Sequence, residues 1–263
     1  MSMKTSLETQ TITFEQPLND AIRICLRLEH LFIELDTYMH SSTLSSSRIA
    51  VPALLEVLNV IDRPDLKSKL TQTLMQQASA LTQLQRSPHV NIEELNNCLN
   101  KLNQAITVLH NTRTKIGDKL RQNEFLNHVR MQLNTPGGAC DFTTPMFALW
   151  LKQSVSMRHH HLKEWQTEFQ MLREVSELLL HLIRQSADPL TMTAQEGFYQ
   201  QSLNPSVPYQ LVQITIPIEM NVFPEISVGK HRMAIRFLSP DFHGARPTPI
   251  RKTIKFDLNL CKI

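Results

Sequence analysis

The stretch from Asn134 to Phe142, with the sequence NTPGGACDF, holds residue types that chemistry often needs: adjacent glycines, a cysteine and an aspartate. It lacks the Gly-Lys-Ser or Gly-Lys-Thr ending of a phosphate-binding loop, and it matches neither G-x-G-x-x-G nor G-x-S-x-G. A nucleophilic Cys140 would need a histidine or carboxylate partner, and the sequence around it offers no convincing one. The pattern therefore predicts a turn between two helices, in which the glycines supply positive φ.

The histidine triplet His159–His161 also suggests chemistry, because imidazoles bind metal ions. Consecutive residues on a helix point about 100° apart, so three in a row converge poorly on one ion, and no H-E-x-x-H motif occurs. Cys25, Cys98, Cys140 and Cys261 have no C-x-x-C spacing, which disfavours structural zinc and fits reduced thiols in a cytoplasm. We therefore expect solvated histidines, and neither a metal, a cofactor nor a catalytic residue. An enzyme that uses Cys140 or the histidines is kept as an alternative.

Positive side chains form a more informative pattern near the C-terminus. In the segment KHRMAIR, Lys230, Arg232 and Arg236 are expected on the polar face of one strand. Alternate residues of a strand project from the same face about 6.5–7 Å apart, so this row suits an acidic, extended peptide. An ordinary solvated strand face is the alternative interpretation.

Arg27 is the second basic residue of interest. It follows Arg23 by one helical turn and lies within an otherwise apolar stretch, CLRLEHLF. Because a covered cation needs a partner, we expect Arg27 to be partly buried and paired with Glu29 or Glu34.

The composition sets the broad class. The chain has 263 residues, with 41% hydrophobic and 19% charged residues, as expected for a folded globular protein. A net charge of +3 and only 6% aromatic residues argue against a dedicated nucleic-acid binder, although one that uses the same basic rows remains the main alternative. No apolar run approaches the roughly 20 residues that span a bilayer, and the polar first residues do not resemble a signal peptide. We expect neither a nucleic acid nor a membrane as partner.

The apolar periodicity predicts helices through the first two thirds of the chain. The segments near 66–84 and 95–109 read as an antiparallel hairpin, and Asn91-Ile92-Glu93-Glu94 has the form of a capping box before the second. Further helices are predicted at about 17–39, 49–61, 120–133, 146–150 and 155–185.

Beyond residue 189 the apolar residues alternate with polar ones, which predicts strands at 212–218, 233–237 and 254–260. No helix separates these strands, so we expect a small antiparallel sheet, with Thr11–Glu15 as a fourth member. The predicted class is α+β, an N-terminal helical bundle followed by a small antiparallel β domain. The expected division is a disordered arm at 1–10, a helical domain at 11–187 and a β domain at 188–263.

Several motifs of the chain are long and irregular: FEQPLND, RICLRLEHLF, LNTPGGACDFTTP with the later WL, LIRQSA, GFYQ and FPEISVGKHRMAIRFL. Together they resemble the ZapD family of bacterial cell-division proteins. The first two resemble the start of that family, the third its central loop, and the last three its β-domain motifs. The helices between residues 40 and 120 carry little of the resemblance. Ala139 stands where the family often has a second cysteine and Asp141 where it often has serine, which weakens any essential cysteine role.

The resemblance implies a non-enzymatic, cytoplasmic homodimer at the midcell division ring, whose helical domain forms the dimer. Such a protein binds the C-terminal tail of the tubulin-like GTPase FtsZ and crosslinks its protofilaments. The PGG turn is expected to bring its flanking cations near the sheet. For a protein of this kind we expect the tail to bind Arg27, Arg130, Lys152, Arg232 and Arg236, with Arg63 and Lys230 as outer candidates.

Overall fold

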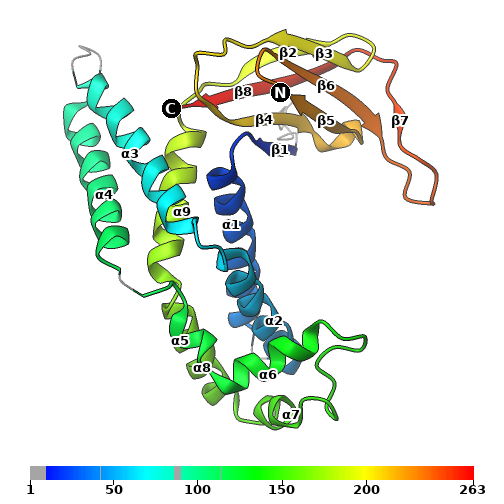
Figure 1. Cartoon of the computed structure of the whole chain (residues 1–263). Helices are drawn as coiled ribbons and strands as arrows, with labels where there is room; N and C mark the ends of the chain where they lie inside the picture. Colours follow the sequence, from blue (N-terminus) through cyan, green and yellow to red (C-terminus); the bar gives the residue numbers. More distant parts are fainter. Residues whose placement is uncertain (1–9, 42, 86–89, 113) are drawn as a thin grey trace, which may run out of the picture. The chain divides into compact units, whose positions relative to one another are not determined.

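The computed structural model describes residues 10–41, 43–85, 90–112 and 114–263, and it confirms the α+β class (Figure 1). Residues 1–9, which make up most of the expected disordered arm, lie outside the described residues. The contacts divide the chain into two compact units. The helical unit is Arg23–Leu180, and the β unit joins the residues up to Ile22 with His181–Ile263.

The helices occupy the first two thirds of the chain, as the apolar period predicts. Asn91 caps the second helix of the predicted hairpin, because its Oδ1 accepts the backbone N–H groups of Glu93 and Glu94 at 3.1 and 3.3 Å. The helices are α1 (Asp20–Met39), α2 (Leu44–Ile61), α3 (Leu66–Leu84), α4 (Ile92–Asn111), α5 (Asp118–Arg121), α6 (Glu124–Leu133), α7 (Pro145–Leu151), α8 (Val155–Thr167) and α9 (Gln170–Arg184).

Three helix predictions need correction. The helix expected over 120–133 is divided into α5 and α6, with Asn123 as the N-cap of α6. The first helix begins at Asp20 rather than near residue 17, because Pro17 still pairs in a strand. The helix expected over 155–185 is broken into α8 and α9. At the break, Phe169 N–H bonds to the Gln166 carbonyl at 3.0 Å, three residues back, and the Phe169 ring is fully buried near Phe32, with ring centroids 6.5 Å apart.

Helix α2 is the apolar segment that bears on the membrane expectation. It is 18 residues long with a mean hydropathy of 1.4, so by length and composition it could cross a membrane. Half of that segment is buried inside the structure. A core helix of a soluble protein has the same composition, and α2 packs against α6, α7 and α8.

The C-terminal strands are antiparallel, as predicted, and they form two sheets rather than one. The first sheet has the order β1-β4-β8-β2, so the N-terminal strand does join the β unit. The second has the order β3-β6-β5, and the two-residue β7 pairs with β6. The strands are β1 (Thr11–Pro17), β2 (Leu190–Ala194), β3 (Phe198–Ser202), β4 (Tyr209–Pro217), β5 (Phe223–Val228), β6 (Arg232–Ser239), β7 (Thr248–Pro249) and β8 (Ile254–Lys262), with a 3-10 turn η1 (Ile218–Met220) after β4.

The alternating apolar residues of β4, β6 and β8 form a single core between the two sheets. Ile214, Ile235 and Phe256 are each at most 2% exposed, and the Phe237 and Phe256 rings pack with centroids 5.2 Å apart. Since the inward residues of β6 fill this core, its alternate residues are directed to the outer face of the second sheet.

Candidate functional site

The glycine-rich loop is a turn, as predicted. Gly137 and Gly138 have φ values of 84° and 55°, which favour glycine, and Gly138 N–H donates to the Thr135 carbonyl at 2.8 Å. The Cys140 thiol lies 3.2 Å from the Thr143 hydroxyl. In the described part of the chain, no hydrogen bond joins Cys140 to a histidine or a carboxylate, so the loop offers no assembled nucleophile.

The histidine triplet is not the solvated run that was expected. His160 is exposed, but His159 Nε2 lies 3.2 Å from the Ser41 carbonyl oxygen, and His161 accepts a hydrogen bond from the Trp150 indole at 3.0 Å. Sequence reasoning missed these contacts because the partners come from other segments. The described residues contain no group of three or more histidine, cysteine or acidic side chains placed to hold a metal ion.

The outer face of the β3-β6-β5 sheet carries Arg232 and Arg236 on its central strand. Both arginines are exposed. In the register, Arg236 lies opposite Phe198 of β3 and Glu225 of β5. Neither side chain makes an ion pair or hydrogen bond with any described residue, so both guanidinium groups are available to a partner.

Lys230 is not on this strand, which corrects the prediction for the KHRMAIR segment. Gly229 N–H donates to the Arg232 carbonyl at 2.9 Å, and this bond places Lys230 and His231 in the turn between β5 and β6. Lys230 is exposed there and lines a cavity of about 350 Å³. The rest of that lining is largely apolar and prolyl, and includes Leu203, Val207 and Tyr209.

The cations of the helical unit differ in how far they are already engaged. Arg27 and Lys152 are exposed, and neither has an ion pair or hydrogen-bond partner for its side chain among the described residues. Arg27 is therefore neither partly buried nor paired with Glu29 or Glu34, because it lies on the solvent side of α1 between the buried Ile24 and Leu28.

Arg130 and Arg63 lie near one acidic residue at the end of α2. Arg130 Nη2 is 3.5 Å from Asp62, whose other oxygen is 3.6 Å from Arg121. Arg63 is exposed and lines a cavity of about 330 Å³ together with Asp62, Lys67 and Arg121. A ligand that binds Arg130 must therefore compete with Asp62 for its guanidinium group.

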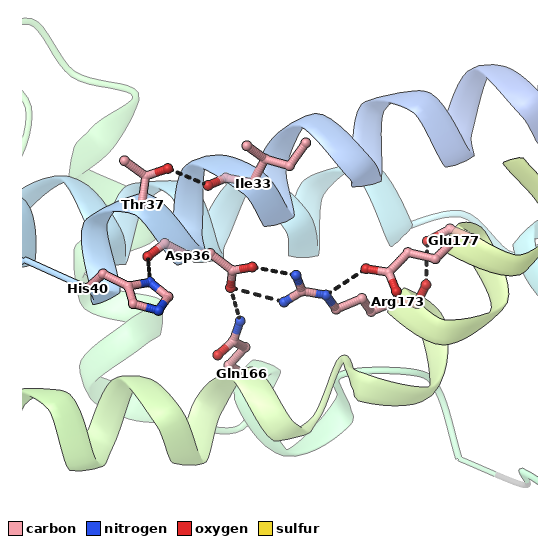
Figure 2. Close-up of polar contacts among 8 residues, drawn as sticks. Ile33, Asp36, Thr37, His40, Gln166, Arg173 and Glu177 are labelled. Carbon is pink, nitrogen blue, oxygen red and sulfur yellow. Dashed lines mark hydrogen bonds and ion pairs between the residues drawn. The ribbon is translucent and has the colours of Figure 1, made fainter. Parts of the chain in front are cut away.

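One polar cluster of the helical unit was not predicted (Figure 2). Arg173 on α9 donates to both carboxylate oxygens of Asp36 on α1, Gln166 donates to the same carboxylate at 2.8 Å, and Arg173 Nε donates to Glu177 at 2.9 Å. These bonds from Arg173, and then from Gln166, outweigh partial burial and lower the pKa of Asp36. The Arg173 guanidinium also lies over the Phe32 ring at 5.4 Å. This cluster is structural, since it ties together three helices.

A second cluster fixes the N-terminal strand in the β unit. Arg184 donates to both oxygens of Glu15 at 2.9 and 2.7 Å, and Gln213 of β4 donates to Glu15 at 2.8 Å. Burial raises the pKa of Glu15, but the bonds from Arg184 and Gln213 outweigh it, so the net shift is downward. Glu15 of the FEQP motif therefore positions β1.

The fold is that of an α+β protein with a helical unit and a β-sandwich unit. The candidate binding groups on its surface are the exposed arginine and lysine side chains described above. The family model of ZapD, a cell division protein, matches residues 26–236. Cell division protein ZapD of Coxiella burnetii (strain RSA 331 / Henzerling II) is 49% identical over 254 residues, which is 96% of this chain and 98% of that protein. The ZapD proteins of Azoarcus sp. (strain BH72) and Chromobacterium violaceum are 34% and 32% identical, over 96% and 95% of this chain and 100% and 99% of those proteins.

The chain belongs to the ZapD family of cell division proteins. Its role is in cell division and septation, and its family is not a known enzyme family.

Proposed function

We propose that this chain binds the C-terminal tail of FtsZ through exposed cations and, as a homodimer, crosslinks FtsZ protofilaments at the midcell division ring in the cytoplasm. It does so without catalysis and without a cofactor. The observation that carries the proposal is the pair of exposed arginines on β6, Arg232 and Arg236, whose side chains have no ion-pair or hydrogen-bond partner among the described residues.

The sandwich surface suits a short peptide with acidic and apolar side chains. Arg232 and Arg236 project from the same face roughly 13 Å apart, because two strand residues advance the chain by about 6.5–7 Å. Lys230 borders a cavity of about 350 Å³ whose lining includes Leu203, Val207 and Tyr209. An extended peptide can therefore place carboxylates on the arginines while an apolar side chain fills the cavity.

Arg27 and Lys152 are proposed as further tail contacts from the helical unit, with Arg63 as an outer one. Arg130 is proposed as a weaker contact, because it must share its charge with Asp62. Each site should bind one tail modestly, since exposed ion pairs contribute only about 0–1 kcal/mol each. A two-fold dimer carries the site twice, so on a polymer with many tails the second contact forms at high effective concentration.

The test is charge reversal at Arg232, with Lys255→Glu as the matched control. Lys255 is also exposed on the β unit, but it belongs to β8 of the other sheet. Reversal removes one attraction and adds one repulsion of about 0.5–1 kcal/mol each, so Arg232→Glu should weaken binding of a synthetic FtsZ tail peptide roughly 5- to 30-fold. Lys255→Glu should bind like the unmodified chain, and both variants should sediment as dimers.

Three outcomes contradict separate parts of the proposal. Unchanged peptide binding by Arg232→Glu contradicts the site assignment. A monomer in sedimentation, or equal bundling of FtsZ polymers that lack the tail, contradicts the crosslinking mechanism. Tight binding of duplex DNA with no binding of the tail would favour the nucleic-acid alternative.

A further inference from the structure

The Trp150 side chain makes one specific polar contact, and that contact depends on the protonation of a histidine. The indole Nε1–H donates to His161 Nδ1 at 3.0 Å. An indole nitrogen can only donate, so Nδ1 of His161 must present a lone pair and the ring must be neutral with its proton on Nε2. The His161 ring also stacks on Trp165, with centroids 5.8 Å apart and planes 17° apart.

This contact holds the last turn of α7 against α8. Arg158 of α8 donates to the carbonyl of Leu151 at 3.4 Å, so α8 touches α7 at two adjacent residues, Trp150 and Leu151. The next residue, Lys152, ends α7 and is exposed. Helices α6, α7 and α8 lie together at one end of the helical unit (Figure 1).

Aromatic rings pack around the contact between Trp150 and His161. Phe125 of α6 lies 5.7 Å from Trp150 and 5.6 Å from Trp165, centroid to centroid. The ring of Phe147 stacks on Trp150 at 5.9 Å. Trp150 is 7% exposed among these rings, so a repulsive contact with the half-buried His161 acts on the indole and on the end of α7 that carries it.

Protonation of His161 would place an N–H on Nδ1 against the indole N–H, which replaces a hydrogen bond by two opposed donors. The ring of exposed His160 lies 6.0 Å from the His161 ring, centroid to centroid. The other charged and titratable groups on the helices packed around His161 are Arg158, His159, Lys163 and Glu164 of α8, Glu124, His128 and Arg130 of α6, Arg48 and Glu56 of α2, and Lys152 at the end of α7.

We propose that His161 is a pH-sensitive positioning residue. When neutral it fixes the last turn of α7 and the adjacent Lys152, and when protonated it releases them. The consequence for tail binding rests on the proposed function, in which Lys152 contacts the tail. Acidification should then lower the affinity of the protein for the FtsZ tail without unfolding the helical unit.

The experiment uses the full chain and three variants. His161→Asn places an oxygen acceptor near the position of Nδ1 and does not titrate, His161→Phe keeps a ring over Trp165 but removes the acceptor, and His160→Asn is the neighbouring control. Since Trp150 and Trp165 are the two tryptophans of the chain, their fluorescence reports directly on this cluster. The unmodified chain and His160→Asn should show a fluorescence transition as the pH falls from about 8 to about 5, and both His161 variants should lack it.

Binding of the synthetic tail peptide supplies the second readout. Between about pH 7.5 and pH 5.5, the affinity of the unmodified chain should fall about fivefold further than that of His161→Asn, which corresponds to the loss of about one hydrogen bond. His161→Phe should bind like the acidified protein at both values.

A transition that persists in His161→Asn overturns the proposal. So does an affinity for the tail whose pH dependence is the same in the unmodified chain and in His161→Asn. If the peptide binds at no pH, the proposed function fails, and the fluorescence transition alone then decides whether His161 controls the α7 contact.

Discussion

Removal of the Asp36 carboxylate should destabilise the helical unit by about 2 kcal/mol. Breaking a fully buried ion pair costs about 3–5 kcal/mol, whereas an exposed pair contributes about 0–1 kcal/mol. The Asp36 and Arg173 side chains are 32% and 22% exposed, which places this pair between the two limits. Arg173 keeps its bond to Glu177 after the substitution Asp36→Ala, so the stranded guanidinium is not wholly unpaired.

The assay is urea unfolding of Asp36→Ala, Arg173→Ala and the double variant, followed by far-ultraviolet circular dichroism. We expect a coupling free energy of about 1–2 kcal/mol between the two sites, because the residues form direct hydrogen bonds. The matched control is the exposed pair Arg48–Asp141, with side chains 43% and 69% exposed. Its cycle should give a coupling of about 0–0.5 kcal/mol. Equal coupling in the two cycles would refute the reasoning from burial.

The same pair gives a signed pH dependence. The Arg173 guanidinium, and next the Gln166 amide, hold the pKa of Asp36 below its ordinary value of about 3.9. A depressed folded-state pKa means that the stabilisation is complete above the unfolded pKa and is lost as the pH falls through the folded pKa. The stability difference between the unmodified chain and Asp36→Asn should therefore be constant above roughly pH 5 and shrink below roughly pH 4. A difference that grew on acidification would contradict the assigned sign.

Two further predictions concern thiols and the internal partner of a surface arginine. Burial raises the pKa of the Cys25 thiol to about 12 and that of the Cys261 thiol to about 11, so at about pH 8 iodoacetamide should modify the half-buried Cys98 well before either, as measured by mass spectrometry. Asp62→Asn should strengthen tail-peptide binding about two- to fivefold by releasing Arg130, and an unchanged affinity would show that Arg130 does not contact the tail.

The parts of the fold that depend on local periodicity could be predicted from the sequence. The α3–α4 hairpin follows from leucines at three- and four-residue spacing and from the cap at Asn91. The strands β4, β6 and β8 follow from strict alternation, because one side of each strand faces the sandwich core. In both cases the signal lies within one short segment.

The parts that depend on distant contacts could not be predicted. The apolar stripe continues from α8 into α9, so no local sequence feature predicts that the helix breaks before Gln170. The break is set by the burial of Phe169. Lys230 and Arg232 are two residues apart, a spacing that predicts the same face of one strand. In the structure, the hydrogen bond from the Gly229 N–H to the Arg232 carbonyl closes a turn that contains Lys230. The partition of the strands into two sheets likewise follows from pairing between distant segments, as in Phe14 opposite Ile214.

The same distinction governs the surface cations. In the sequence, Arg130 lies just before one family motif and Arg232 lies within another, so neither arginine is distinguished from the other as a tail contact. The fold pairs Arg130 with Asp62 at 3.5 Å and leaves Arg232 exposed on a central strand with no ion-pair or hydrogen-bond partner for its side chain in the described chain. A peptide that binds Arg130 must compete with an existing ion pair, whereas one that binds Arg232 displaces only water. Charge reversal at Arg232 should consequently weaken tail binding more than charge reversal at Arg130, and the reverse order would show that the fixed position of Arg130 matters more than its pairing.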